Sequence, residues 1–99
     1  MYTEIINEFQ HTYRYDYYDM YESFDNLPDI SDELLKAIED DPSIPDNEYY
    51  EAEEALYEIE HKADFLRREA GQDSEECISA IHEWYGTIQG IMEELKILP

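Results

Sequence analysis

The hydrophobic residues of the chain recur at spacings of three and four, which is the period of an amphipathic helix. No segment of any length alternates polar and apolar residues with the period of two that is typical of a strand. The pattern is interrupted at the segments NLPD, DDPSIPDN and GQ, which are rich in turn-forming residues. The sequence therefore predicts an all-α protein with four helices, and residues 1–99 are expected to form a single domain.

The first predicted helix begins at Thr3, a suitable N-cap, and continues to about Phe24. Its apolar face consists of Ile6, Phe9, Tyr13, Tyr17, Met20 and Phe24. The segment NLPD is expected to end this helix, because proline removes a backbone donor. Ser31 is then expected to cap a short second helix. The inward-facing residues of this second helix are Leu34, Leu35 and Ile38.

The third and fourth predicted helices have the most regular apolar seams. The third begins near Asp46 and ends before Gly71, and its heptad-like seam consists of Tyr49, Ala52, Leu56, Ile59, Ala63, Leu66 and Ala70. The fourth begins at Asp73, with Glu76 as a capping-box-like partner. Its seam consists of Cys77, Ile81, Trp84, Ile88, Ile91 and Leu95. Two such helices with a short connection predict a coiled-coil-like antiparallel hairpin within a small four-helix bundle.

Charge limits the classes of partner. The chain of 99 residues holds 27 acids and 6 bases, a net charge of -21. Such a chain is repelled by nucleic acid and by anionic membranes, so we expect neither as a direct ligand. Residues 1–60 carry 19 of the acids and only two bases. We therefore expect a protein partner with a basic surface, contacted through the first three-fifths of the chain.

The sequence also bears on location. Cys77 is the only cysteine, which excludes an internal disulfide and a thiolate zinc site. No apolar run approaches the length of a membrane span, and MYTEIINEF lacks the basic-then-apolar order of a signal peptide. A cytoplasmic location is the resulting expectation.

Tyrosines lie beside carboxylates on helix faces that point away from the apolar stripes. Tyrosine is a frequent anchor of protein interfaces, and carboxylates three or four residues apart on a helix lie about 5–6 Å from one another. A row of such carboxylates approximates the phosphates of B-DNA, which follow at about 3.4 Å along each strand. The candidate partner-binding residues are Tyr15, Tyr18, Asp19, Glu22, Asp40, Asp41, Tyr50, Glu51, Glu54, Tyr57 and Glu58. The alternatives are that these tyrosines pack within the chain, that the faces are merely solvated, or that the third helix forms a homodimer.

In size, helical pattern and content of Asp, Glu and Tyr, the chain resembles phage-encoded DNA mimics of the antirestriction and anti-CRISPR type. This resemblance implies a non-enzymatic inhibitor that blocks the basic nucleic-acid-binding surface of a nuclease, a CRISPR complex or a restriction complex. The segment PDNEYYEAEE, with adjacent Tyr49 and Tyr50, is also similar to small acidic four-helix immunity proteins. That second resemblance implies an antitoxin that neutralises one basic nuclease toxin.

Two E-x-x-H pairs, Glu8–His11 and Glu58–His61, have the spacing used by di-iron carboxylate bundles. In such bundles the ligands project inward, whereas here both pairs fall away from the apolar faces. The chain also lacks an EF-hand loop and a phosphate-binding glycine loop. We therefore expect no enzyme activity, no catalytic residue, no metal and no cofactor.

Gly86 and Gly90 lie four residues apart on the polar side of the fourth predicted helix. Each costs about 1 kcal/mol of helix stability relative to alanine. They indicate either a locally weak or bent helix, or a face that a partner or a second copy of the chain approaches closely.

Overall fold

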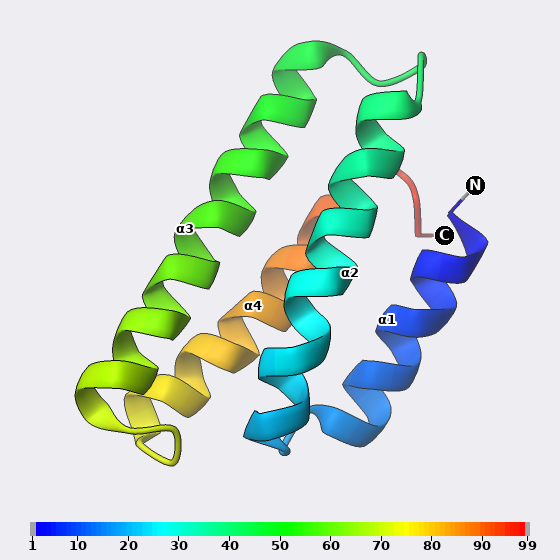
Figure 1. Cartoon of the computed structure of the whole chain (residues 1–99). Coiled ribbons are helices and arrows are strands. Elements are labelled where there is room, and N and C mark those ends of the chain that lie inside the picture. Colours follow the sequence, from blue (N-terminus) through cyan, green and yellow to red (C-terminus); the bar gives the residue numbers. More distant parts are fainter. Residues whose placement is uncertain (1, 99) are drawn as a thin grey trace.

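The structure, a computed structural model, describes residues 2–98 and contains four helices and no strand within that range (Figure 1). The helices are α1 (Thr3–Asp16), α2 (Met20–Asp40), α3 (Asp46–Ala70) and α4 (Glu75–Glu94). The predicted all-α fold is thus confirmed. Helices α3 and α4 form the most extensive contact of any pair and run antiparallel, which confirms the predicted hairpin.

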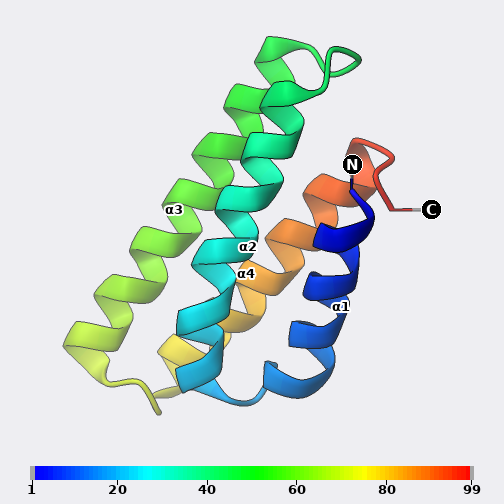
Figure 2. The same ribbon diagram turned by 45° about the vertical axis from the view of Figure 1, so that its right-hand side comes forward.

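Helix α2 occupies the middle of the bundle and contacts each of the other three helices. Figure 2 shows α1 and α3 on opposite sides of α2. The turns at residues 17–19 and 71–74 lie at one end of the bundle, and the α2–α3 loop lies at the other (Figure 1). The bundle measures 41 × 25 × 17 Å, so its two ends present separate surfaces. Within residues 2–98, no helix is both long enough and apolar enough to cross a lipid bilayer.

The core contains most of the predicted seam residues, together with apolar residues from every helix. Its buried members are Ile5, Phe9, Met20, Leu27, Ile30, Leu34, Ile38, Ala52, Leu56, Ile59, Ala63, Cys77, Ala80, Ile81, Trp84, Tyr85, Ile88 and Met92. Tyr85 lies outside the predicted seam and is nevertheless fully buried, because the rings of Phe9, Tyr13 and Tyr17 pack on it from α1 and the turn that follows. Ala70 is exposed although it continues the α3 seam, so the seam ends before the helix does.

The predicted continuous helix from Thr3 to Phe24 is wrong, because the chain turns at residues 17–19. The Asp19 side chain accepts a hydrogen bond from the backbone N–H of Glu22 and thereby caps α2. The Ser23 hydroxyl donates to the carbonyl of Asp16 at 2.7 Å, which satisfies an acceptor at the end of α1. These local bonds stabilise a break that the unbroken amphipathic periodicity does not reveal.

The predicted break at NLPD is also wrong, because this segment lies inside α2. Pro28 costs that helix about 3 kcal/mol, but the fully buried side chains of Leu27 and Ile30 lie on either side of it and offset the cost. Ser31, the predicted N-cap, is instead 2% exposed. Its hydroxyl accepts a hydrogen bond from the indole N–H of Trp84 at 3.0 Å. Tertiary packing has therefore overridden a helix-breaking signal.

Helix α4 is capped by Ser74 rather than by Asp73 as predicted. The Ser74 hydroxyl accepts a hydrogen bond from the backbone N–H of Cys77 at 3.2 Å. Gly71, with φ of +93°, ends α3 as expected from its position. Asp73 is consequently an exposed residue of the α3–α4 turn, and capping does not use its carboxylate.

Gly86 and Gly90 allow a direct test of the weak-helix interpretation. Both lie in exposed positions of α4, and a Cβ at either position would meet no neighbouring atom within 4 Å. We expect Gly86→Ala and Gly90→Ala each to raise the free energy of unfolding by about 0.5–1 kcal/mol, because alanine has the higher helix propensity. Urea unfolding followed by circular dichroism measures this. A loss of stability in either variant would contradict the open environment of these glycines.

Candidate partner-binding surfaces

The predicted partner-binding residues do not form one surface. The α1–α2 turn and the helix ends beside it carry Tyr15, Tyr18, Asp19 and Glu22. The opposite end of α2 carries Asp40 and Asp41. Helix α3 carries Tyr50, Glu51, Glu54, Tyr57 and Glu58, which we call the α3 outer surface. Because α1 and α3 lie on opposite sides of α2, the first and third groups face different directions.

The α3 outer surface is exposed along its whole length, as the sequence predicted. Tyr50 and Tyr57 are each 62% exposed, and the three glutamates of this surface are exposed as well. Residues 46–60 contain seven acids and no base. Because a helix rises about 1.5 Å per residue, Glu51, Glu54 and Glu58 follow one another at about 4.5 and 6 Å along the axis. The surface therefore presents a row of negative charges beside two tyrosine rings.

Neighbouring side chains hold both rings of this surface. The Tyr50 ring lies 5.4 Å from that of Tyr49, and the Tyr57 ring stacks on that of His61 at 4.5 Å. Tyr49 in turn donates a hydrogen bond to Glu53 at 3.0 Å, which raises the pKa of Tyr49 to about 12. Side chains that are ordered before binding lose less conformational entropy when a partner docks.

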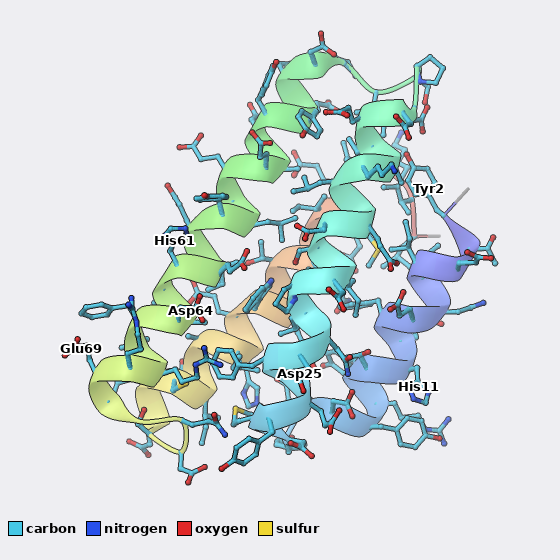
Figure 3. The ribbon with its side chains drawn as sticks, in the orientation of Figure 1. Tyr2, His11, Asp25, His61, Asp64 and Glu69 are labelled. Atoms are coloured by element: carbon cyan, nitrogen blue, oxygen red, sulfur yellow. The ribbon has the colours of Figure 1, made fainter. Side chains whose placement is uncertain are left out.

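Asp41 is already engaged within the chain. Its carboxylate accepts hydrogen bonds from the Tyr2 hydroxyl at 2.6 Å and from the backbone N–H and hydroxyl of Ser43 at 2.9 and 2.6 Å. The bonds from Ser43 and Tyr2 lower the pKa of Asp41, while burial and the bond to Asp41 raise the pKa of Tyr2. Asp41 thus links the start of α1, marked by Tyr2 in Figure 3, to the α2–α3 loop.

Asp40 belongs to an acidic groove between α1 and α2. This groove has a volume of about 410 Å³ and is lined by Glu4, Ile5, Glu8, Glu33, Lys36, Ala37 and Asp40. A hydrogen bond shared with Glu33, together with burial and the nearby charges of Glu33, Asp29 and Glu4, raises the pKa of Glu8. The sequence placed Asp40 among the partner-binding residues but did not reveal this pairing of carboxyl groups across two helices.

Two glutamates with a raised pKa predict a dependence of stability on pH. Burial and the nearby charges of Asp32 and Asp64 raise the pKa of Glu60, as Glu33 and burial do for Glu8. The contribution of both groups to stability is complete below pH 4.5 and is lost as the pH rises through their raised pKa values. The pKa of Asp41 is lowered from 3.8, so its contribution to stability is present above pH 3.8 and is lost only as the pH falls through the lowered value. We therefore expect a higher melting temperature at pH 5 than at pH 7. Glu33→Gln is expected to raise the melting temperature at pH 7 more than at pH 5, and an equal effect at both would contradict the shared proton.

The α1–α2 turn forms part of a second surface, which we call the tyrosine hollow. It has a volume of about 420 Å³ and is lined by Tyr15, Tyr18, Asp19, Met20, Tyr21 and Asp73. The sequence predicted three of these residues for partner binding, assigned Met20 to the apolar face of the first helix, and missed Tyr21 and Asp73. Tyr21 was hidden by the wrong extension of the first helix, and Asp73 by its assignment as a cap. The signal that could have found Tyr21 is the density of tyrosines in residues 13–21.

The two E-x-x-H pairs lie on different sides of the bundle. Figure 3 shows His11 on α1 and His61 on α3 at opposite edges, both outside the packed interior. His11 packs on the ring of Tyr15 at 4.6 Å, and His61 packs on that of Tyr57. Within residues 2–98, no three His, Cys, Asp or Glu side chains are grouped so that they could hold a metal ion.

Comparison with known proteins does not extend this description. No protein-family model matches the sequence, and no curated protein or solved structure matches it. Its function is therefore inferred from the charge, exposure and contacts of the described residues.

Proposed function

We propose that the chain is a non-enzymatic inhibitor, a DNA mimic that binds the basic nucleic-acid-binding surface of a nuclease, CRISPR or restriction complex and blocks it. The observation that carries this proposal is the α3 outer surface. It combines three exposed carboxylates and two exposed, pre-ordered tyrosines on a helix segment that has seven acids and no base. Its carboxylates would occupy the places of phosphates in charge-assisted hydrogen bonds with arginine and lysine.

In this mechanism, charge affects the rate of association and aromatic area affects the rate of dissociation. The net charge of -21 attracts a basic partner over a distance of about a Debye length, so association should slow as salt is added. Tyr50 and Tyr57 supply area that is desolvated on contact, which limits dissociation. The inhibitor would thus exclude nucleic acid by occupying its site, without any chemical step.

A second candidate is an immunity protein that neutralises one basic nuclease toxin. The tyrosine hollow favours it, because three exposed rings at one end of the bundle suit a compact interface with an aromatic centre. Binding through such an interface depends less on long-range charge than the binding of a DNA mimic does. Added salt should therefore weaken the binding of an immunity protein less than that of a mimic.

The test is retention of host proteins on the immobilised chain at low and at high salt, with mass spectrometry of what is retained. Each retained protein is then purified and assayed for competition between the chain and duplex DNA. A basic protein that is released by high salt and binds either the chain or DNA, but never both, is the expected result. A single small toxin retained at high salt would favour the immunity protein. Simultaneous binding of DNA and the chain would overturn the mimic.

A further inference from the structure

The tyrosine hollow combines aromatic rings and carboxylates from two turns that are distant in sequence. Tyr15, Tyr18 and Tyr21 are 61%, 83% and 71% exposed. Asp19 comes from the α1–α2 turn and Asp73 from the α3–α4 turn, which lie at the same end of the bundle (Figure 1). Exposed rings of this number around one depression are unusual for a surface that contacts only water.

Two of the rings are held in place although they are exposed. The Tyr18 ring meets that of Tyr17 edge-on at 4.9 Å and that of His82 edge-on at 5.7 Å. Tyr17 and His82 are themselves stacked in parallel at 4.0 Å, which fixes the support beneath Tyr18. The Tyr15 ring packs on that of His11 at 4.6 Å. The hollow is therefore formed before any ligand binds.

The chemistry of the hollow suits a cation. The faces of tyrosine rings carry negative potential and attract ammonium and guanidinium groups within about 6 Å. One carboxylate oxygen of Asp19 accepts the hydrogen bond that caps α2, and both Asp19 and Asp73 contribute a carboxylate to the lining of the hollow. The chain already shows this contact at the rim, where the guanidinium carbon of Arg14 lies 5.4 Å from the centre of the Tyr15 ring.

We propose that the tyrosine hollow receives one arginine side chain of the partner protein. The proposal rests on the proposed function, since it names the basic group that a partner would insert at this end of the bundle. Arginine fits better than lysine because its planar guanidinium stacks on a ring and simultaneously donates to carboxylates at its edge. The hollow would thus fix the position of a partner that the acidic helices attract from a distance.

The test needs no partner protein. Nα-acetyl-arginine methylamide is titrated into the ¹⁵N-labelled chain at constant ionic strength, and backbone amide shifts are followed by NMR. The matched probe is Nα-acetyl-citrulline methylamide, which has nearly the same shape but no charge. We expect saturable shifts confined to residues 15–21 and 72–74 with the arginine probe only. Equal shifts with citrulline, or arginine shifts of the same size along the α3 outer surface, would overturn the proposal.

Substitutions of the tyrosines distinguish the contribution of the aromatic rings from that of the overall negative charge. Tyr18→Leu and Tyr21→Leu keep an apolar side chain but remove the ring, and each is expected to weaken the arginine probe about two- to fivefold. Tyr21→Phe keeps the ring and should keep the affinity. Tyr57→Leu on α3 is the matched control and should change nothing. Nα-acetyl-lysine methylamide, which has the same charge but no planar guanidinium, is expected to bind more weakly. Unchanged affinity in both leucine variants, or equal affinity for the lysine and arginine probes, would overturn the arginine assignment.

Failure of this inference can be told apart from failure of the proposed function. If the arginine probe does not bind but the chain still competes with DNA for a basic protein, only the hollow has lost its role. If the probe binds at the hollow and no basic protein is retained, the hollow is a guanidinium site and the mimic is wrong.

Discussion

Glu54→Lys together with Glu58→Lys is expected to weaken binding to the basic partner by roughly 30- to 150-fold at low salt, or about 2–3 kcal/mol. Both side chains are exposed members of the α3 outer surface. The double substitution removes two attractive contacts and places two positive charges against a basic surface, and such like-charge contacts are costly. Titration calorimetry at several salt concentrations measures the loss, which should shrink as salt screens the repulsion.

The control for this experiment is Glu76→Lys together with Glu93→Lys. These two exposed glutamates lie near opposite ends of α4, and their replacement changes the net charge by the same amount, from -21 to -17. If attraction depended on net charge alone, the two double variants would lose equal affinity. Equal losses would therefore contradict a specific role for α3, and circular dichroism of both variants establishes that they remain helical.

Ser23→Ala is expected to lower the free energy of unfolding by about 1–3 kcal/mol, which is large for a domain of this size. The Ser23 hydroxyl donates to the Asp16 carbonyl and therefore accepts the hydrogen bond of the Tyr85 hydroxyl at 2.9 Å. Alanine leaves the Tyr85 hydroxyl without a partner in the core, whereas the Asp16 carbonyl still accepts the backbone N–H of Asp19 at 2.9 Å. Urea unfolding measures the loss.

A double-mutant cycle with Tyr85→Phe tests this origin of the loss. Phenylalanine removes the buried hydroxyl, so Ser23→Ala should cost much less in the Tyr85→Phe background than in the natural chain. Additive effects would show instead that Ser23 acts only through its bond to Asp16. The result also concerns the tyrosine hollow, because this network fastens the turn that carries Tyr18 and Asp19 to α4.

The α3–α4 hairpin could be predicted from the sequence because its information is local. A seam that repeats every three and four residues along most of α3 specifies both the helix and its buried side. The opposite side is then exposed by geometry alone, so the direction of Tyr50, Glu54 and Tyr57 followed without knowledge of the packing.

The first half of the fold could not be predicted in this way, because the local sequence patterns there predict a break and a helix where the tertiary structure has the opposite. The segment NLPD predicts a helix break, but the burial of Leu27 and Ile30 keeps α2 continuous through Pro28. The periodicity of residues 17–19 predicts a helix, but the cap by Asp19 and the hydrogen bonds of Ser23 create a turn. At NLPD the local preference competes with the packing of Leu27 and Ile30 in the core, and at residues 17–19 the helical periodicity competes with local capping bonds and with the distant bond between Ser23 and Tyr85.

The sequence by itself thus determined the helical class, the α3–α4 hairpin and the acidic, tyrosine-bearing outer side of α3. Each of these depends on composition or on the angle between successive side chains of one helix. Only the tertiary structure decided where α1 ends, that Glu33 lies close enough to raise the pKa of Glu8, and that Tyr21 and Asp73 line one hollow. The hollow requires two turns about 50 residues apart in the sequence to lie at the same end of the bundle, and the effect of Glu33 on Glu8 requires two helices to pack side by side. Periodicity along one helix holds no information about either arrangement.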